Sequence, residues 1–105
     1  MISPDVIQDA VRRLVAAARP TRVILFGSYG RGGATEDSDL DLLVVLNQVS
    51  SRRAEMVRVR NVLRPLRIPA DVLVVSEDQL FEWGDVVGTV LHEALAQGRV
   101  LYEAA

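Results

Sequence analysis

Cysteine and lysine are both missing from this 105-residue sequence. Without cysteine the chain has no disulfide, no zinc-thiolate site and no thiol nucleophile, so any metal chemistry must use oxygen ligands. All 12 basic residues are arginine, which excludes a lysine nucleophile and a P-loop lysine. Several large classes of enzyme site are therefore excluded before any motif is considered.

Long apolar runs and an excess of positive charge are absent as well. Runs such as Leu42 to Leu46 are too short to cross a membrane, and the N-terminus lacks the layout of a signal peptide, so we expect a cytoplasmic protein. The formal net charge of -2 gives no general attraction to nucleic acid. Because 50% of the residues are apolar and the mean hydropathy is +0.20, we expect residues 1–105 to form a single domain with a filled core.

The order of predicted elements is that of a small α+β (α/β) fold. Apolar and β-branched runs predict strands at Thr21–Phe26, Leu40–Leu46, Ala70–Val75 and Arg99–Tyr102. Spacing and capping signals predict helices from Ser3-Pro4-Asp5 to Pro20, from about Ser51 to Arg64, from a Ser76/Gln79 capping box to near Gly84, and from an Asp85 cap to Gly98, with one helical turn at Ser28. This order predicts a mixed sheet of three to four strands flanked by helices.

Two carboxylates interrupt an apolar strand. Because side chains alternate along a strand, Asp39 and Asp41 share one face and lie roughly 6 to 7 Å apart at the backbone. Like charges this close raise each other's pKa unless a cation compensates them, and oxygen ligands favour Mg²⁺ or Mn²⁺. Asp71 begins the next predicted strand and would join the pair if the two strands are neighbours. Three converging carboxylates commonly hold two metal ions in phosphoryl or nucleotidyl transfer.

A glycine-rich turn before these acids suits a phosphate group. Gly27 ends the preceding strand and lets the backbone approach a ligand, while Ser28 offers a hydroxyl and free N–H groups. Arg31 follows with a fork of donors for phosphate oxygens. Each signal is weak alone. Together, a buried strand, Gly-Ser, ten residues, Asp-x-Asp in a second strand and Asp in a third indicate a functional site.

The pattern Gly27-Ser28-x10-Asp39-x-Asp41, with Arg31-Gly32 and Ser38 inside it and Asp71 beyond, resembles the minimal nucleotidyltransferase (MNT) family of the DNA polymerase β superfamily. The resemblance covers nearly the whole chain, including the tail from Gly98 to Glu103, although Gly30 stands where alanine is expected.

This resemblance implies a polymerase β-like nucleotidyltransferase fold and a set of site residues. Asp39, Asp41 and Asp71 would be catalytic and would bind two Mg²⁺ ions, whereas Gly27, Ser28, Arg31 and Ser38 would bind a nucleoside triphosphate. Members often act as antitoxins of HEPN ribonuclease toxins, and some transfer AMP from ATP to a toxin tyrosine. The chain is therefore expected to be a Mg²⁺-dependent protein adenylyltransferase with a HEPN toxin as its partner.

Three rival functions remain open at this stage. The first is an antitoxin that neutralises its partner by contact alone, and the second is a small-molecule adenylyltransferase of the aminoglycoside type, which would need a further substrate domain. The third, RNA binding without modification, is opposed by the acidic balance. Because the predicted elements use nearly every residue, little remains for an acceptor pocket. A second macromolecule, or a second copy of the chain, is expected to supply the acceptor and part of the nucleotide site.

Some remaining residues have both a structural and a functional interpretation. Pro65 interrupts the stripe formed by Arg53, Arg60, Arg64 and Arg67, which favours a solvated face over a grip on RNA or acids. We expect His92 to be structural or exposed and Tyr102 to pack at the sheet edge. For Tyr29, stacking on a base and lining the loop are equally favoured. The last predicted helices carry a group of apolar residues, for which we favour a place in the core over a partner interface: Phe81, Trp83, Val86, Val87, Val90 and Leu91.

Overall fold

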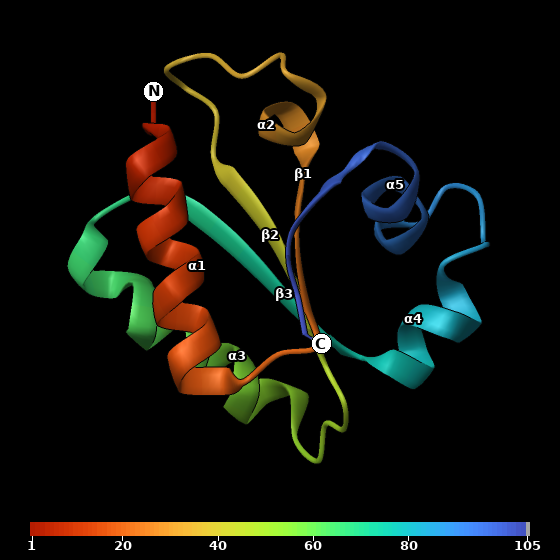
Figure 1. Ribbon diagram of the computed structural model, residues 1–105. Coiled ribbons are helices and arrows are strands. Elements are labelled where there is room, and N and C mark those ends of the chain that lie inside the picture. Colours follow the sequence, from red (N-terminus) through yellow and green to blue (C-terminus); the bar gives the residue numbers. More distant parts are fainter. Residues whose placement is uncertain (105) are drawn as a thin grey trace.

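A computed structural model describes residues 1–104 of the chain. These residues form a four-stranded sheet in the order β3-β2-β1-β4, built from β1 (Arg22–Phe26), β2 (Leu40–Leu46), β3 (Ala70–Ser76) and β4 (Arg99–Glu103). Strand β1 is antiparallel to β2 and β4, whereas β2 and β3 are parallel. Figure 1 shows α1 (Pro4–Ala18) and α3 (Arg52–Leu63) on one face and α4 (Glu77–Trp83) and α5 (Val90–Gln97) on the other. The predicted fold class is confirmed.

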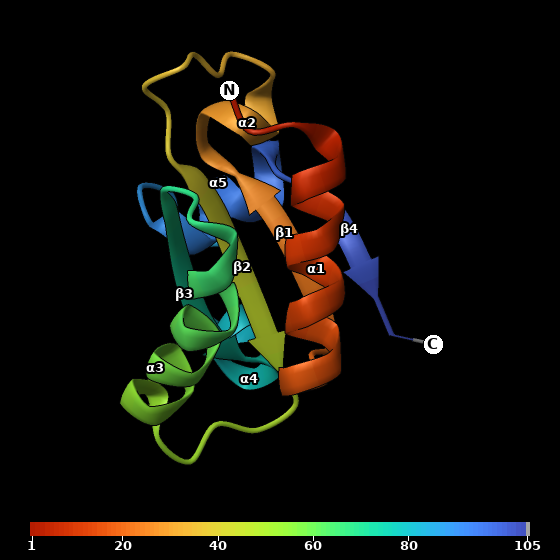
Figure 2. The same cartoon turned by 90° about the vertical axis from the view of Figure 1, so that its left-hand side faces the viewer.

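Helix α1 begins and ends where its local signals place it. The Ser3 hydroxyl accepts a hydrogen bond from the Val6 N–H, and Pro4 occupies the first turn, where its missing N–H has no intrahelical partner to lose. Arg19 closes the helix in the left-handed conformation, with φ 48°. Ala10, Val11 and Leu14 are buried in the core that α1 forms with the sheet. Figure 2 shows α1 lying along the sheet, seen from the side of α1 and α3.

Strand β2 lies inside the sheet and is covered on both faces. Leu40, Leu42 and Val44 belong to the core beneath α1 and α3, whereas Leu43 and Val45 belong to the core beneath α4 and α5. A strand that is buried on both faces has a continuous apolar sequence. For this reason the bounds of β2 agree with those predicted from the sequence. Asp41 is the one charged residue in this strand, on the α4 and α5 face.

Helix α3 packs along a narrow stripe. Ser51 caps it by accepting from the Ala54 N–H at 3.2 Å, and Val59 and Leu63 are buried. Ala54 and Val57 are apolar as well but are exposed, because α3 contacts α1 and β3 along one side only. Pro65 lies in the short 3-10 helix η1 (Arg64–Leu66), which ends the run.

The chain between β3 and β4 differs in part from expectation. The capping box is confirmed: the Gln79 N–H donates to the Ser76 hydroxyl at 3.1 Å, and the Ser76 N–H donates to the Gln79 side chain at 3.3 Å. The Asp85 cap is wrong, because α5 begins at Val90 with Thr89 as its cap. Gly88 lies between them with φ 92°, a conformation that no helix continues through.

This difference leaves apolar side chains on the surface. Phe81 and Val87 are 87% and 82% exposed, and Trp83, Val86 and Val90 are also exposed, so the core interpretation is wrong for these five residues. Leu91 packs against the core beneath α4 and α5, and Tyr102 lies half-buried on the outer strand β4, as expected. Among the described residues, no helix has both the length and the apolar character needed to cross a membrane.

Candidate active site

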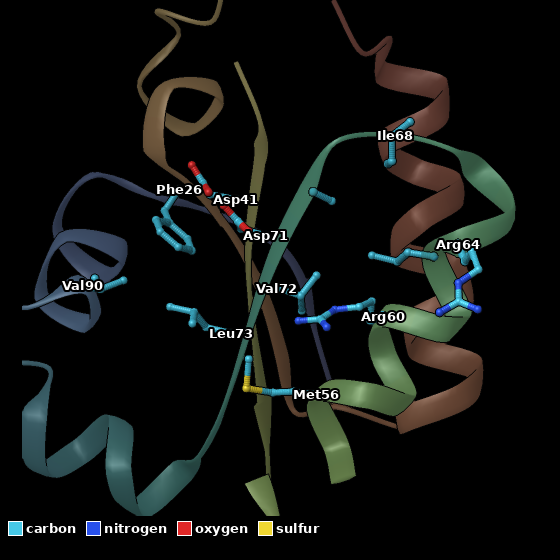
Figure 3. A pocket seen from close by; sticks show the side chains of 12 residues that line it. Phe26, Asp41, Met56, Arg60, Arg64, Ile68, Asp71, Val72, Leu73 and Val90 are labelled. Atoms are coloured by element: carbon cyan, nitrogen blue, oxygen red, sulfur yellow. The ribbon is translucent and has the colours of Figure 1, made fainter. Parts of the chain in front are cut away.

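Asp41 and Asp71 are brought together by strand pairing. They are direct register partners of the parallel strands β2 and β3, so their backbones lie about 4.8 Å apart. Both side chains project from the same face of the sheet into one space (Figure 3). The prediction that these two strands are neighbours is confirmed. Asp39 lies two residues before Asp41, just outside β2, and is exposed.

The charges around Asp41 are poorly balanced. Burial raises the pKa of the Asp41 carboxyl above its usual value, and the negative charges of Asp71, Asp39 and Glu93 raise it further, with Arg31 opposing. Ionised Asp41 is therefore disfavoured in this position. A cation placed among these carboxylates would relieve that unfavourable state.

The carboxylates do not form a complete metal cage in this structure. Within residues 1–104, no group of three or more His, Cys, Asp or Glu side chains stands in an arrangement that could hold a metal ion. The donor chemistry nevertheless fits a hard divalent cation, because every candidate ligand is a carboxylate oxygen and Arg31 alone opposes the negative charge around Asp41. The catalytic and metal-binding roles of Asp39, Asp41 and Asp71 stay predictions.

Gly27 is the residue that allows the turn to begin beside Asp41. Helix α2 (Gly27–Arg31) starts directly after β1, whose last residue, Phe26, is the register partner of Asp41. Gly27 has φ 66°, and a Cβ atom at this position would overlap the Asp41 carboxylate. Both facts require glycine. Half-buried Ser28 follows at once, so the predicted phosphate-binding pair adjoins the paired acids.

The glycine at position 30, where alanine is expected, has a packing explanation. A Cβ atom at Gly30 would lie 2.6 Å from the Leu25 carbonyl oxygen, and one at Gly98 would lie 2.9 Å from the same oxygen. The short helix α2 and the junction between α5 and β4 thus both pack closely against the Leu25 carbonyl group. Neither position has room for a methyl group without movement of the backbone around it.

Arg31 is held by a residue that the sequence did not indicate. Its Nη1 atom lies 2.8 Å from Oε1 of Glu93 on α5. The two residues are 62 positions apart, so no local spacing signals this ion pair. One edge of the Arg31 guanidinium is engaged by Glu93, while its other N–H groups make no protein hydrogen bond within residues 1–104.

Three other predicted residues have roles that support the fold. The Ser38 hydroxyl accepts from the Thr35 N–H at 2.9 Å and so closes the loop before β2. Tyr29 is buried in the core on the α1 side, and its hydroxyl accepts from the Ile2 N–H at 2.9 Å, so the base-stacking interpretation is wrong. His92 contacts the Gly84 carbonyl oxygen through Nδ1 at 3.1 Å, which agrees with a structural role.

A cavity of about 680 Å³ lies beside the paired acids. Figure 3 shows its lining on both sides of β3, with Asp41 and Asp71 on one side and Arg60 and Arg64 on the other. All four arginines of the stripe are exposed, as expected for a solvated face, and Arg60 and Arg64 also line this cavity. There is also more space next to the acids than the sequence led us to expect.

Comparisons with known proteins identify a family and a curated relative of this chain. The family model for the nucleotidyltransferase domain matches residues 5–96. MJ1305 of Methanocaldococcus jannaschii, named as a candidate protein adenylyltransferase, is 51% identical over 37 residues, which are 35% of this chain and 25% of that protein. The match thus spans about a quarter of the length of this curated relative.

Two solved structures share the fold at low sequence identity. A chain of a toxin–antitoxin structure with AMP-PNP has a TM-score of 0.65 at 22% identity, covering 92% of this chain and 73% of that one. A chain from the complex of tri-AMPylated Shewanella oneidensis HEPN toxin with an MNT antitoxin has a TM-score of 0.61 at 17% identity, covering 95% and 72%. The family model matches most of the chain, so the resemblance drawn from the sequence is confirmed: the chain belongs to the nucleotidyltransferase domain family.

Proposed function

We propose that this chain transfers AMP from ATP to a hydroxyl group, a tyrosine, of a partner HEPN toxin and thereby acts as an antitoxin, with residues 1–105 as a single catalytic domain. The observation that carries the proposal is the direct pairing of Asp41 with Asp71 beside Gly27-Ser28. The family match supports nucleotidyl transfer, and the name of the curated relative supports protein as the acceptor. The toxin–antitoxin structures that share the fold support the kind of partner.

The triphosphate would lie along the turn that follows β1. In this proposal the Gly27 backbone and the Ser28 hydroxyl hold the β- and γ-phosphates, while the N–H groups of Arg31 not bonded to Glu93 donate to phosphate oxygens. Ser38 keeps the following loop closed at the edge of the nucleotide site. The α-phosphorus is then placed near Asp41 and Asp71.

Asp39, Asp41 and Asp71 are the residues that would hold divalent metal, Mg²⁺ or Mn²⁺. Bound there, two such ions would neutralise phosphate charge and stabilise the leaving pyrophosphate. The excess of negative charge that raises the pKa of Asp41 is the feature of this chain that favours metal binding.

The transfer itself exchanges one phosphorus–oxygen bond for another. The acceptor oxygen attacks the α-phosphorus in line, its proton passes to Asp71, and the bond from the α-phosphorus to the bridging oxygen breaks to release pyrophosphate. Asp71 suits the role of proton acceptor because it is exposed at the start of β3, on the side open to an incoming protein.

The test is incubation of the purified chain with labelled ATP, Mg²⁺ and the product of its neighbouring gene. Label on the partner is expected with the native chain, and Asp39→Asn, Asp41→Asn and Asp71→Asn should each abolish it while circular dichroism stays native. Undiminished labelling by the double variant at 39 and 41 contradicts the proposal. Inhibition of the toxin without any label supports the contact-only alternative instead.

A further inference from the structure

Strand β3 is an open edge of the sheet beside the paired acids. Its strand neighbour is β2, and within residues 1–104 no strand lies on its other side. The Leu40 N–H donates to the Pro69 carbonyl at 2.8 Å, so the backbone groups of Pro69 and of every second residue after it are directed to β2. Because alternate residues of a strand turn toward opposite neighbours, the backbone groups of Ala70, Val72 and Val74 are directed to the open side.

The two faces of this edge carry opposite charges. Asp71 faces the same space as Asp41, whereas Val72 faces the side of α3 and η1 that carries Arg60 and Arg64 (Figure 3). The cavity includes residues from both sides of β3, so both groups border the same open edge. A strand added along β3 would send successive side chains alternately toward the acids and toward the arginines.

Arg60 and Arg64 carry positive charge that the chain does not neutralise. Both are exposed, and neither takes part in an ion pair within residues 1–104, whereas the arginines that do are Arg12, Arg13, Arg22, Arg31 and Arg58. Two such arginines beside an unpaired strand edge favour an acidic occupant. The carboxylates of Asp41 and Asp71 on the other face oppose a polyanion that would cover both faces, as nucleic acid would.

We propose that an extended acidic segment of the acceptor protein adds to the open edge of β3 as a fifth strand. Its acceptor hydroxyl points to the Asp71 face, and an Asp or Glu directly next to it in sequence points to Arg60 and Arg64. Main-chain hydrogen bonds to Val72 hold the segment, and the alternation of side chains gives the specificity. This inference rests on the proposed transfer and deepens it by naming the acceptor as a hydroxyl residue with an acidic immediate neighbour in a strand.

Binding of synthetic peptides tests the docking without any transfer. The probes are nine-residue peptides with a central tyrosine and Glu at positions ±1, Glu at ±2, or Lys at ±1, together with a ten-nucleotide RNA, all measured by fluorescence anisotropy. The ±1 Glu peptide is expected to bind about tenfold more tightly than the other two peptides, as two half-exposed ion pairs imply. Equal binding of the three peptides, or tighter binding of RNA than of the ±1 Glu peptide, would overturn the proposal.

Variants of α3 and η1 assign the binding to this edge. Arg60→Gln combined with Arg64→Gln should weaken the ±1 Glu peptide about tenfold. Arg53→Gln is the matched control, because Arg53 is exposed on the same helix and does not line the cavity, and it should change nothing. Hydrogen exchange at the Val72 amide should slow when the peptide is bound. Unchanged binding in the double variant, or unchanged exchange at Val72, counts against strand addition.

Transfer to the whole partner separates this inference from the proposed function. The double arginine variant should raise KM for the partner about tenfold, with kcat and the affinity for ATP unchanged. Transfer with an unaltered KM in that variant defeats the edge inference and leaves the proposed function standing. Absence of transfer by the native chain defeats the proposed function, and the peptide measurements then decide the edge inference alone.

Discussion

At the scale of single residues, Asp41 is where the fold and the chemistry make opposite demands. It interrupts a strand buried on both faces, and it lies against Gly27 and opposite Asp71. A neutral or apolar residue would suit the sheet better. The carboxylate is unfavourable for folding at this position, which is the usual mark of a residue kept for function.

Replacing Asp41 by Asn should stabilise the metal-free protein at neutral pH. The pKa of Asp41 is raised in the folded state, so the ionised group destabilises the fold at pH values above that raised pKa. The penalty shrinks as the pH falls through the raised folded pKa and disappears only below the unfolded value of 3.8, where both states hold the proton. Thermal melting with EDTA should give a Tm a few degrees higher for Asp41→Asn at pH 7 and no difference near pH 3.

An exposed aspartate outside the strand serves as the control for this measurement. Asp37→Asn, in the exposed loop before β2, should leave Tm unchanged at both pH values. Added Mg²⁺ should raise the Tm of the native chain and have little effect on Asp41→Asn. A lower Tm for Asp41→Asn at pH 7 would show that the charge is compensated within the protein.

Gly27 and Gly32 offer a matched pair for testing the contact with Asp41. Both have positive φ, 66° and 80°, so alanine at either should cost about 1 to 2 kcal/mol of folding free energy. A Cβ atom at Gly27 also meets the Asp41 carboxylate, whereas one at Gly32 meets no atom of the described residues within 4 Å. Gly27→Ala should therefore lose nucleotide transfer and Gly32→Ala should retain most of it, as a labelled-ATP assay can show. Equal loss in both variants would assign the effect to backbone strain.

At the scale of elements, two helical segments end on arginines in the left-handed conformation. Arg67 follows η1 with φ 51°, a conformation that disfavours every residue with a Cβ atom. Arg67→Gly should raise the free energy of unfolding by about 0.5 to 1 kcal/mol, since relief of that strain exceeds the added entropy of the unfolded chain. Arg53→Gly, inside α3, should lower it by about 1 kcal/mol. Urea denaturation of both variants checks the opposite signs.

The elements that sequence predicts well are those fixed by neighbouring residues. Ser3-Pro4, Ser51 and the Ser76/Gln79 box mark their helix starts because each cap bonds within three positions. The start of α5 was predicted wrongly because Gly88 has a positive φ, and no pattern in the neighbouring residues predicts that conformation.

The candidate site follows the same rule. Asp39, Asp41 and Gly27-Ser28 could be identified from spacing along the chain, and the pairing of β2 with β3 could be anticipated from their similar patterns. The contact of Glu93 with Arg31, and the position of Arg60 and Arg64 across β3 from the acids, depend on how distant elements pack. Local sequence patterns do not predict contacts between residues that are far apart in the chain.

At the scale of the whole molecule, α4, α5 and the segment between them expose a group of apolar side chains. Phe81 and Val87 are almost fully exposed, and Val90, also exposed, lines the cavity next to Asp41 and Asp71. A surface of this kind is typical of a protein interface. The place of Val90 in the cavity lining supports the proposed protein acceptor.

Substitutions on this surface should weaken the partner complex and leave the fold intact. The double variant Phe81→Ala, Val87→Ala should raise the Kd for the partner about tenfold, measured by calorimetry. Truncating apolar anchor residues of an interface typically costs about 1 to 2 kcal/mol of binding free energy. Val57→Ala is the control, since Val57 is 48% exposed on the opposite side of the sheet. Equal affinities for all three chains would place the interface elsewhere.

The open edge of β3 has a practical consequence for handling the protein. Strand β3 has the sequence ADVLVVS, in which Asp71 is the sole charged residue. Charges on edge strands keep β-proteins from joining edge to edge. Asp71→Asn, which we expect to abolish the proposed transfer, would also remove this charge from the edge strand. The Asp71→Asn protein should therefore precipitate at concentrations where the Asp41→Asn protein stays soluble.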